Sequence, residues 1–191
     1  MENLVEVKID SLRVSLTNQQ RIIVLKDIDQ DRYLPIWIGP FEAEAITIAL
    51  QEIEISRPQT HDLFKNMLSG LDAQLLRVII SDLNEDIFYG TLVLKSGKEE
   101  IEIDSRPSDA IAIAVREHVP ILVAAAVMDE ASIIPEEIAL SASEENDTEE
   151  VGDNASAQDR LSIFEDYLKK KINGKEDKEG DSDDPVSPSK N

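Results

Sequence analysis

The chain has 191 residues, no cysteine and a formal net charge of −21 at pH 7. Without cysteine it can form no disulfide, no thiolate zinc site and no cysteine nucleophile, and no apolar run is long enough for a membrane span. The negative charge disfavours nucleic acid, whose phosphates are normally bound by lysine and arginine, so a bound polyanion would need a divalent metal ion or a local arginine cluster.

Runs of apolar residues, several of them alternating with polar ones, predict seven strands. In the first of them the apolar phase changes at Asp10-Ser11, which predicts a bulge or a bend. Turn residues separate the runs, as at Gly39-Pro40. The predicted strands are 4–16, 21–26, 33–38, 73–80, 87–94, 99–104 and 120–124.

Helical patterns lie between these strands. The second helix is expected to begin after an N-cap at Thr60, to end at Gly70 and to bury Leu63, Phe64, Met67 and Leu68. The third contains DAIAIAVRE (109–117), which closely matches EAITIALQE (44–52). Its AIAIAV stretch alternates like a strand, but Pro107 and the alanines favour a helix. The predicted helices are about 42–54, 61–70, the segment after Pro107, 125–131 and 159–173.

The order strand-strand-strand-helix-helix occurs twice. It predicts an α+β fold built from two internally duplicated β-β-β-α-α units in one compact domain, residues 1–140. Residues 141–158 are polar and acidic and read as a disordered linker. Residues 159–173 form an amphipathic pattern with lysines at the end of the helix. The remainder, 174–191, is predicted to be a disordered tail.

Two charged segments, SRPQTHDLFK (56–65) and IDSRPSDAI (103–111), place an arginine before a proline and an acid in the first turn of a helix. Carboxylates can bind Mg²⁺ or Mn²⁺, which lowers the pKa of bound water. Arginine can bind phosphate through two hydrogen bonds, and histidine can transfer a proton. This combination is chemically consistent with metal-assisted phosphodiester hydrolysis, although the spacing alone does not establish it. The residues assigned to it are His61, Asp62 and Asp109 as catalytic groups, Arg57, Arg106, Ser108 and Lys65 as substrate-binding groups, and Asp104, Asp109, Glu44 and Glu42 as metal ligands.

Taken one at a time, these residues are better explained as structural. An acid near a helix N-terminus, such as Asp62 or Asp109, is favoured by about 0.3–1 kcal/mol through the helix dipole alone. An arginine such as Arg57 or Arg106 can pair with such an acid, and surface pairs contribute only about 0–1 kcal/mol. Only their combination favours a site.

Three blocks of the sequence resemble the signature blocks of the bifunctional nuclease family: LPIWIGPFEAEAI (34–46), RPQTHDLFKNML (57–68) and IEIDSRPSDAIAIAV (101–115). The resemblance covers roughly residues 4–135. It implies a compact, internally duplicated α+β domain and the action on DNA and RNA described for some members. Some relatives carry a further helical region associated with nucleotide-excision-repair proteins, which residues 141–191 do not resemble. The polar positions within the three blocks are Glu42, Glu44, Arg57, His61, Asp62, Asp104, Arg106, Ser108 and Asp109.

We therefore expect a cytoplasmic, metal-dependent nuclease of broad specificity that binds nucleic acid and no membrane. A duplicated sheet with exposed edges can pair between chains, so we also expect a homo-oligomer. The alternative is a non-catalytic binding or regulatory module. It would recognise a small anion or a protein partner through the arginine-bearing segments, with the 159–173 helix as a docking element.

Overall fold

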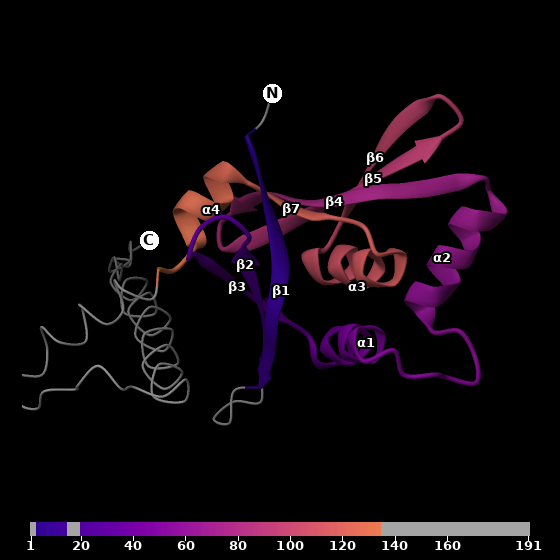
Figure 1. Ribbon diagram of the computed structural model, residues 1–191, viewed down its shortest axis with the longest axis horizontal. Helices are drawn as coiled ribbons and strands as arrows, with labels where there is room; N and C mark the ends of the chain where they lie inside the picture. The colour runs from indigo at the N-terminus through magenta and orange to yellow at the C-terminus, as the bar shows by residue number, and fades with distance from the viewer. Residues whose placement is uncertain (1–2, 15–19, 135–191) are drawn as a thin grey trace, which may run out of the picture. The chain divides into compact units, whose positions relative to one another are not determined.

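The computed structural model describes residues 3–14 and 20–134, which form a seven-stranded sheet and four helices (Figure 1). The predicted linker, amphipathic helix and tail (141–158, 159–173 and 174–191) lie outside the described residues. The strands are β1 (Leu4–Val14), β2 (Arg21–Asp27), β3 (Tyr33–Ile38), β4 (Ala73–Asn84), β5 (Ile87–Ser96), β6 (Glu99–Ser105) and β7 (Ile121–Ala124). The helices are α1 (Pro40–Leu50), α2 (Thr60–Gly70), α3 (Pro107–Glu117) and α4 (Ala125–Ala131).

The sheet has the strand order β3-β2-β1-β7-β4-β5-β6. Neighbouring strands are antiparallel except β4 and β7, which are parallel. The mixed α/β architecture is compatible with the predicted α+β class. Two three-stranded meanders flank β7, but β7 separates α3 from α4 whereas no strand separates α1 from α2, so the internal duplication stays a prediction. The register of β1 shifts between Ile9 and Ser11, which confirms the predicted bulge.

Helix α3 lies at the centre of the hydrophobic core. Every residue from Pro107 to Ala114 is buried except Asp109, which is partly exposed. A helix that is apolar on all sides needs cover on all sides: β4 and β5 contact it on one side, and α1 and α2 contact it on another (Figure 1). The helix prediction for AIAIAV is confirmed, and its alanines let the neighbouring helices pack closely.

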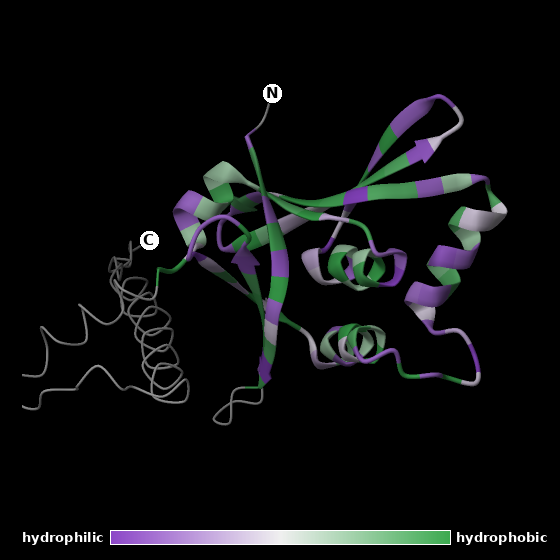
Figure 2. Cartoon of the chain, in the orientation of Figure 1, coloured by the Kyte–Doolittle hydropathy of each residue, from purple (hydrophilic) through white to green (hydrophobic). Residues whose placement is uncertain are grey.

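The prediction for α2 is partly wrong. Leu68 is buried and Phe64 packs against the core, but Leu63 and Met67 are each more than half exposed. The helix lies at the end of the sheet, where its main contacts are with α3 and β4 (Figure 1). In Figure 2 its ribbon is mostly purple and white, unlike the greener α3. A helix at the end of a layer buries a narrower stripe than its sequence pattern suggests.

The edges of the sheet are β3 and β6. Strand β6 is exposed from Glu99 to Asp104, including both isoleucines of its apolar face. An exposed edge strand can pair with another chain, but the predicted homo-oligomer stays a prediction. No helix within residues 3–14 and 20–134 is long and apolar enough to cross a membrane, and the cytoplasmic location also stays a prediction.

A buried carboxylate stabilises the turn between β2 and β3. Asp27 is only 2% exposed, and it accepts hydrogen bonds from the backbone amides of Asp29 (2.9 Å) and Gln30 (3.2 Å). Its other oxygen accepts from Arg32, whose guanidinium also contacts Asp129 on α4 at 3.0 Å. Burial acts to raise the pKa of Asp27, but these hydrogen bonds outweigh it and hold the pKa below its usual range.

We expect Asp27→Asn to lower the free energy of unfolding at pH 7 by about 1.5–3 kcal/mol, the contribution of hydrogen bonds to a charged group. Because the folded pKa lies below the unfolded value of about 3.9, this contribution is complete above that value and is lost as pH falls through the folded pKa. The variant should therefore lose less stability than the wild type between pH 7 and pH 3. Urea unfolding at both pH values measures this. The control Asp82→Asn, at an exposed site on β4, should follow the wild type.

Candidate functional site

A hollow of about 440 Å³ lies where the N-terminal turns of α1, α2 and α3 meet. We call it the three-helix pocket. The first N–H groups of each helix have no partner within the helix and carry a partial positive charge, so helix N-termini favour an anion. The pocket is lined by Phe41, Glu42, Glu44 and Ala45 from α1, Gln59, Thr60 and His61 from the start of α2, and Arg106 and Asp109 from the start of α3.

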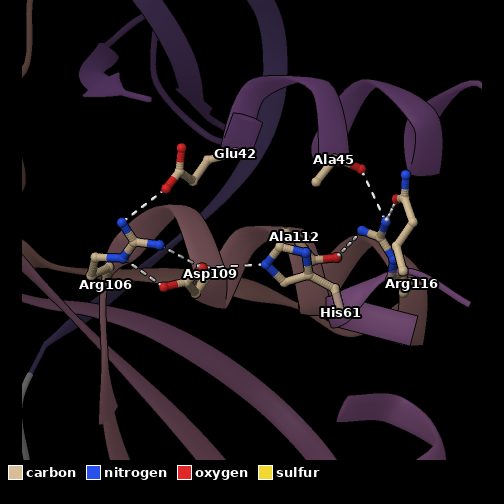
Figure 3. Close-up of polar contacts among 8 residues, drawn as sticks. Glu42, Ala45, His61, Arg106, Asp109, Ala112 and Arg116 are labelled. Carbon is tan, nitrogen blue, oxygen red and sulfur yellow. Dashed lines mark hydrogen bonds and ion pairs between the residues drawn. The ribbon is translucent and has the colours of Figure 1, made fainter. Parts of the chain in front are cut away.

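Arg106 joins two of the helices across this pocket (Figure 3). Its Nε and Nη2 donate to the two oxygens of Asp109 at 2.7 and 3.1 Å, and its Nη1 lies 2.9 Å from a Glu42 oxygen. The pairs with Asp109 and then Glu42 raise the pKa of Arg106. Its side chain is nevertheless 65% exposed, so an anion in solution can reach the guanidinium.

Asp109 also contacts His61, which lies on α2. The distance from His61 Nε2 to Asp109 Oδ1 is 3.2 Å (Figure 3). Burial acts to raise the pKa of Asp109, but hydrogen bonds from Arg106 and His61 outweigh it and keep the pKa below its usual range. The carboxylate is therefore ionised at neutral pH and can hold the imidazole with Nε2 protonated.

Backbone packing fixes the position of Arg106. A Cβ added to Gly90 on β5 would lie 3.1 Å from the carbonyl oxygen of Ser105 and 3.2 Å from backbone atoms of Arg106 and Pro107. Only a glycine lets β5 approach the corner between β6 and α3 this closely. The start of α3, and with it the guanidinium in the pocket, depends on this close approach.

A second arginine holds the three helices together behind the pocket. Arg116 on α3 is only 9% exposed. Its Nε donates to Asp62 at 2.6 Å, and its Nη2 donates to the backbone oxygen of Ala45 on α1 at 3.1 Å and to Gln59 at 3.2 Å. Asp62 also accepts from the Gln59 amide at 2.8 Å, which caps α2. The network positions the helix N-termini that surround the pocket.

Five of the predicted site residues meet in the three-helix pocket: Glu42, Glu44, His61, Arg106 and Asp109. The others lie outside its lining. Asp62 contacts Arg116, and Lys65 donates to the backbone oxygen of Arg116 at 3.0 Å. Ser108 is buried and Arg57 is exposed in the loop between α1 and α2.

Asp104 lies on the opposite face of the sheet. It pairs with Thr91, whereas its neighbour Ile103 pairs with Leu92 of the core. Because successive side chains of a strand point to opposite faces, Asp104 points away from the core face that α3 covers. Its predicted partner Asp109 lies on α3, which packs on that core face, so the two carboxylates are not brought together.

The donor set of the pocket does not fit a divalent metal ion. Within residues 3–14 and 20–134 no three histidine, aspartate or glutamate side chains are grouped so that they could hold a metal. The carboxylates of Glu42 and Asp109 instead share the guanidinium of Arg106. The predicted Mg²⁺ or Mn²⁺ therefore stays a prediction, and the described part of the chain contains no group of ligands for it.

Five residues of the site region were not among the predicted site residues: Phe41, Ala45, Gln59, Thr60 and Arg116. Arg116 carried a signal, since a charged residue in an otherwise apolar helix needs a partner once the helix is buried. Its partner Asp62 is 54 positions away, so no local pattern identifies it. Phe41 carried no signal, because one aromatic residue near a helix start is usually a core residue.

Comparison with known proteins places the chain in a family. The sequence model of the bifunctional nuclease domain matches residues 23–136, which include the whole three-helix pocket. An uncharacterized protein of Mycobacterium tuberculosis is 37% identical over 164 residues, 85% of this chain and 92% of its own length. Bifunctional nuclease 1 of rice (Oryza sativa subsp. japonica) is 37% identical over 116 residues, 59% of this chain but only 35% of the rice protein. Bifunctional nuclease 1 of Arabidopsis thaliana is 29% identical over 93 residues, 47% of this chain and 29% of that protein. The chain therefore belongs to the bifunctional nuclease domain family.

Proposed function

We propose that this protein is a nuclease that hydrolyses phosphodiester bonds of DNA or RNA in the three-helix pocket. One observation carries the proposal: Asp109 binds both a cation that can hold phosphate, Arg106, and a proton-transfer group, His61. Membership of the bifunctional nuclease domain family and the names of the plant relatives support the same class of reaction.

Substrate binding depends on the free donors of Arg106. A guanidinium has five N–H groups, and three contacts go to Asp109 and Glu42. The remaining donors and the exposed side chain are open to a phosphate. The N-termini of the three helices add partial positive charge. Together they offset, at this one place, the repulsion between an anionic substrate and a protein with a net charge of −21.

Proton transfer is assigned to His61. With Nε2 held by Asp109, the other ring nitrogen, Nδ1, is available as a general base for a water molecule. The water oxygen forms the new bond to phosphorus, His61 takes its proton, and the leaving oxygen departs and is protonated by solvent. Donors near the non-bridging oxygens stabilise the added charge in the transition state. Two carboxylates of the pocket, Glu42 and Asp109, are bound to Arg106, so the proposed steps involve only the side chains of the pocket, water and the substrate.

The alternative function is a non-catalytic module that binds a small anion in the same pocket. The observation that favours it is the pairing of Arg106 with two carboxylates, an arrangement that also occurs in purely structural ion-pair networks. The two functions differ in one measurable respect, since a module of this kind binds phosphate without cleaving a phosphodiester.

The proposal is tested with end-labelled single-stranded DNA and RNA oligonucleotides, incubated with the purified chain in Mg²⁺, in Mn²⁺ and in EDTA. We expect cleavage by the wild type and a loss of about 100-fold or more in Asp109→Asn, which releases both His61 and Arg106. The matched control is Asp104→Asn, five positions earlier on the opposite face of the sheet, and it should keep the wild-type rate. Equal rates for the two variants, with both folded by circular dichroism, would show that the pocket is not the active site.

A further inference from the structure

An aromatic side chain stands exposed at the wall of the three-helix pocket. Phe41 is 81% exposed, more than any other large hydrophobic residue among those that the structure describes. It lines the pocket together with Arg106 and His61 and directly precedes Glu42, which contacts Arg106. No packing in the described part of the chain explains it, because the core side of α1 is formed by Ala43 and Ile46.

We propose that Phe41 is the base-stacking residue of this nuclease and makes recognition depend on a base next to the phosphate held by Arg106. The inference rests on the proposed function and adds a determinant of specificity to it. Proteins that bind single strands without sequence preference combine cationic contacts to phosphate with aromatic rings on which bases stack. The pocket contains both groups: Arg106 is the cation that contacts phosphate, and Phe41 is the aromatic ring.

The chemistry of stacking also predicts which substrates are accepted. Every base has a π-face, so stacking on a phenylalanine tolerates any sequence. In a duplex the faces of the bases are already covered by their neighbours, and exposing one of them costs free energy. Phe41 therefore favours unpaired nucleotides, and it does so for ribose and deoxyribose alike because it contacts the base.

The test compares two fluorescein-labelled strands of equal length, a thymidine oligonucleotide and one made of abasic tetrahydrofuran units. Both carry phosphorothioate linkages to slow cleavage. Binding to the intact chain is followed by fluorescence anisotropy at low salt. We expect the wild type to bind the thymidine strand about 5-fold to 150-fold more tightly, the range that corresponds to one stacked base. Phe41→Ala should bring this affinity ratio close to one, mainly by weakening the binding of the thymidine strand.

Two further variants exclude a general loss of apolar surface. Phe41→Trp should keep the preference for the thymidine strand, because an indole also stacks. Leu71→Ala removes another highly exposed apolar side chain, 70% exposed at the end of α2 and outside the pocket lining, and should leave the ratio at the wild-type value. In cleavage assays on unmodified thymidine strands, Phe41→Ala should raise KM more than it lowers kcat.

The outcomes separate this inference from the proposed function. A Phe41-dependent preference for thymidine without any cleavage would support base stacking and contradict the nuclease. If the wild type cleaves nucleic acid but Phe41→Ala leaves the ratio of thymidine-strand to abasic-strand affinity unchanged, only the base-stacking inference is overturned. A wild type that binds both strands equally, or neither, would also overturn the base-stacking inference.

Discussion

Replacing His61 with asparagine is expected to lower the rate of oligonucleotide cleavage by about 100-fold to 10,000-fold, the usual contribution of a general acid or base. Asparagine can still donate a hydrogen bond toward Asp109, so the ion pair with Arg106 should persist and substrate binding should change little. The loss should therefore appear in kcat rather than in KM. Initial rates over a range of oligonucleotide concentrations measure both parameters.

The chain supplies its own control, because it contains only two histidines. His118 is exposed and ends α3 in a left-handed backbone conformation with φ of 53°, which asparagine also adopts readily. His118→Asn should therefore cleave at the wild-type rate. A fall of similar size in both variants, or a wild-type kcat in His61→Asn, would contradict the role assigned to His61.

The second large effect is expected on stability. Arg116→Met should lower the free energy of unfolding by about 3 kcal/mol or more, because breaking a buried ion pair leaves its partners without compensation. The variant deprives Asp62 of its cation and leaves the backbone oxygen of Ala45 without this donor. Methionine has a similar length, so the loss reflects polar contacts more than a cavity. Thermal unfolding followed by circular dichroism should show a decrease of roughly 10 °C in Tm.

The matched control for this change lies on the sheet. Arg77 on β4 contacts Glu100 at 3.1 Å, but both side chains are substantially exposed. Exposed pairs contribute only about 0–1 kcal/mol, so Arg77→Met should leave Tm within about 3 °C of the wild type. If Arg116→Met were no less stable than this control, the buried network would not be what holds the three helices together.

Local physical chemistry made much of the fold predictable. The phase change at Asp10-Ser11 identified the β1 bulge, because side chains alternate with a period of two in a strand. Pro107 and the alanines after it identified α3 despite the alternation of AIAIAV, because backbone preference outweighs a short periodic pattern. In each case a few neighbouring residues contain the whole signal.

The strand lengths of the second meander were less predictable. Strand β4 continues to Asn84, four residues beyond the predicted end, and pairs there with Ile87. The two turn residues, Glu85 and Asp86, both have positive φ, at 49° and 63°. Such turns are usually recognised by glycine or asparagine at these positions. Neither residue is present, so the sequence carried no clear sign of a two-residue hairpin.

The candidate site was predictable only as a list of residues. The sequence places charged residues at three helix starts, but whether those starts meet depends on how α1 and α2 pack around α3. That packing is determined by Arg116, whose contacts join segments more than 50 positions apart. Asp104 is separated from Asp109 for a different reason, because a single step along β6 moves a side chain to the other face of the sheet.

A phosphodiester is expected to bind where the three helices begin, and NMR with a short phosphorothioate-linked thymidine strand tests this most directly. On titration, the backbone amide shifts should concentrate at residues 41–45, 59–61 and 106–109, together with the side-chain Nε–H of Arg106. Shifts confined to another surface, such as the groove lined by His118 and Pro120, would contradict it.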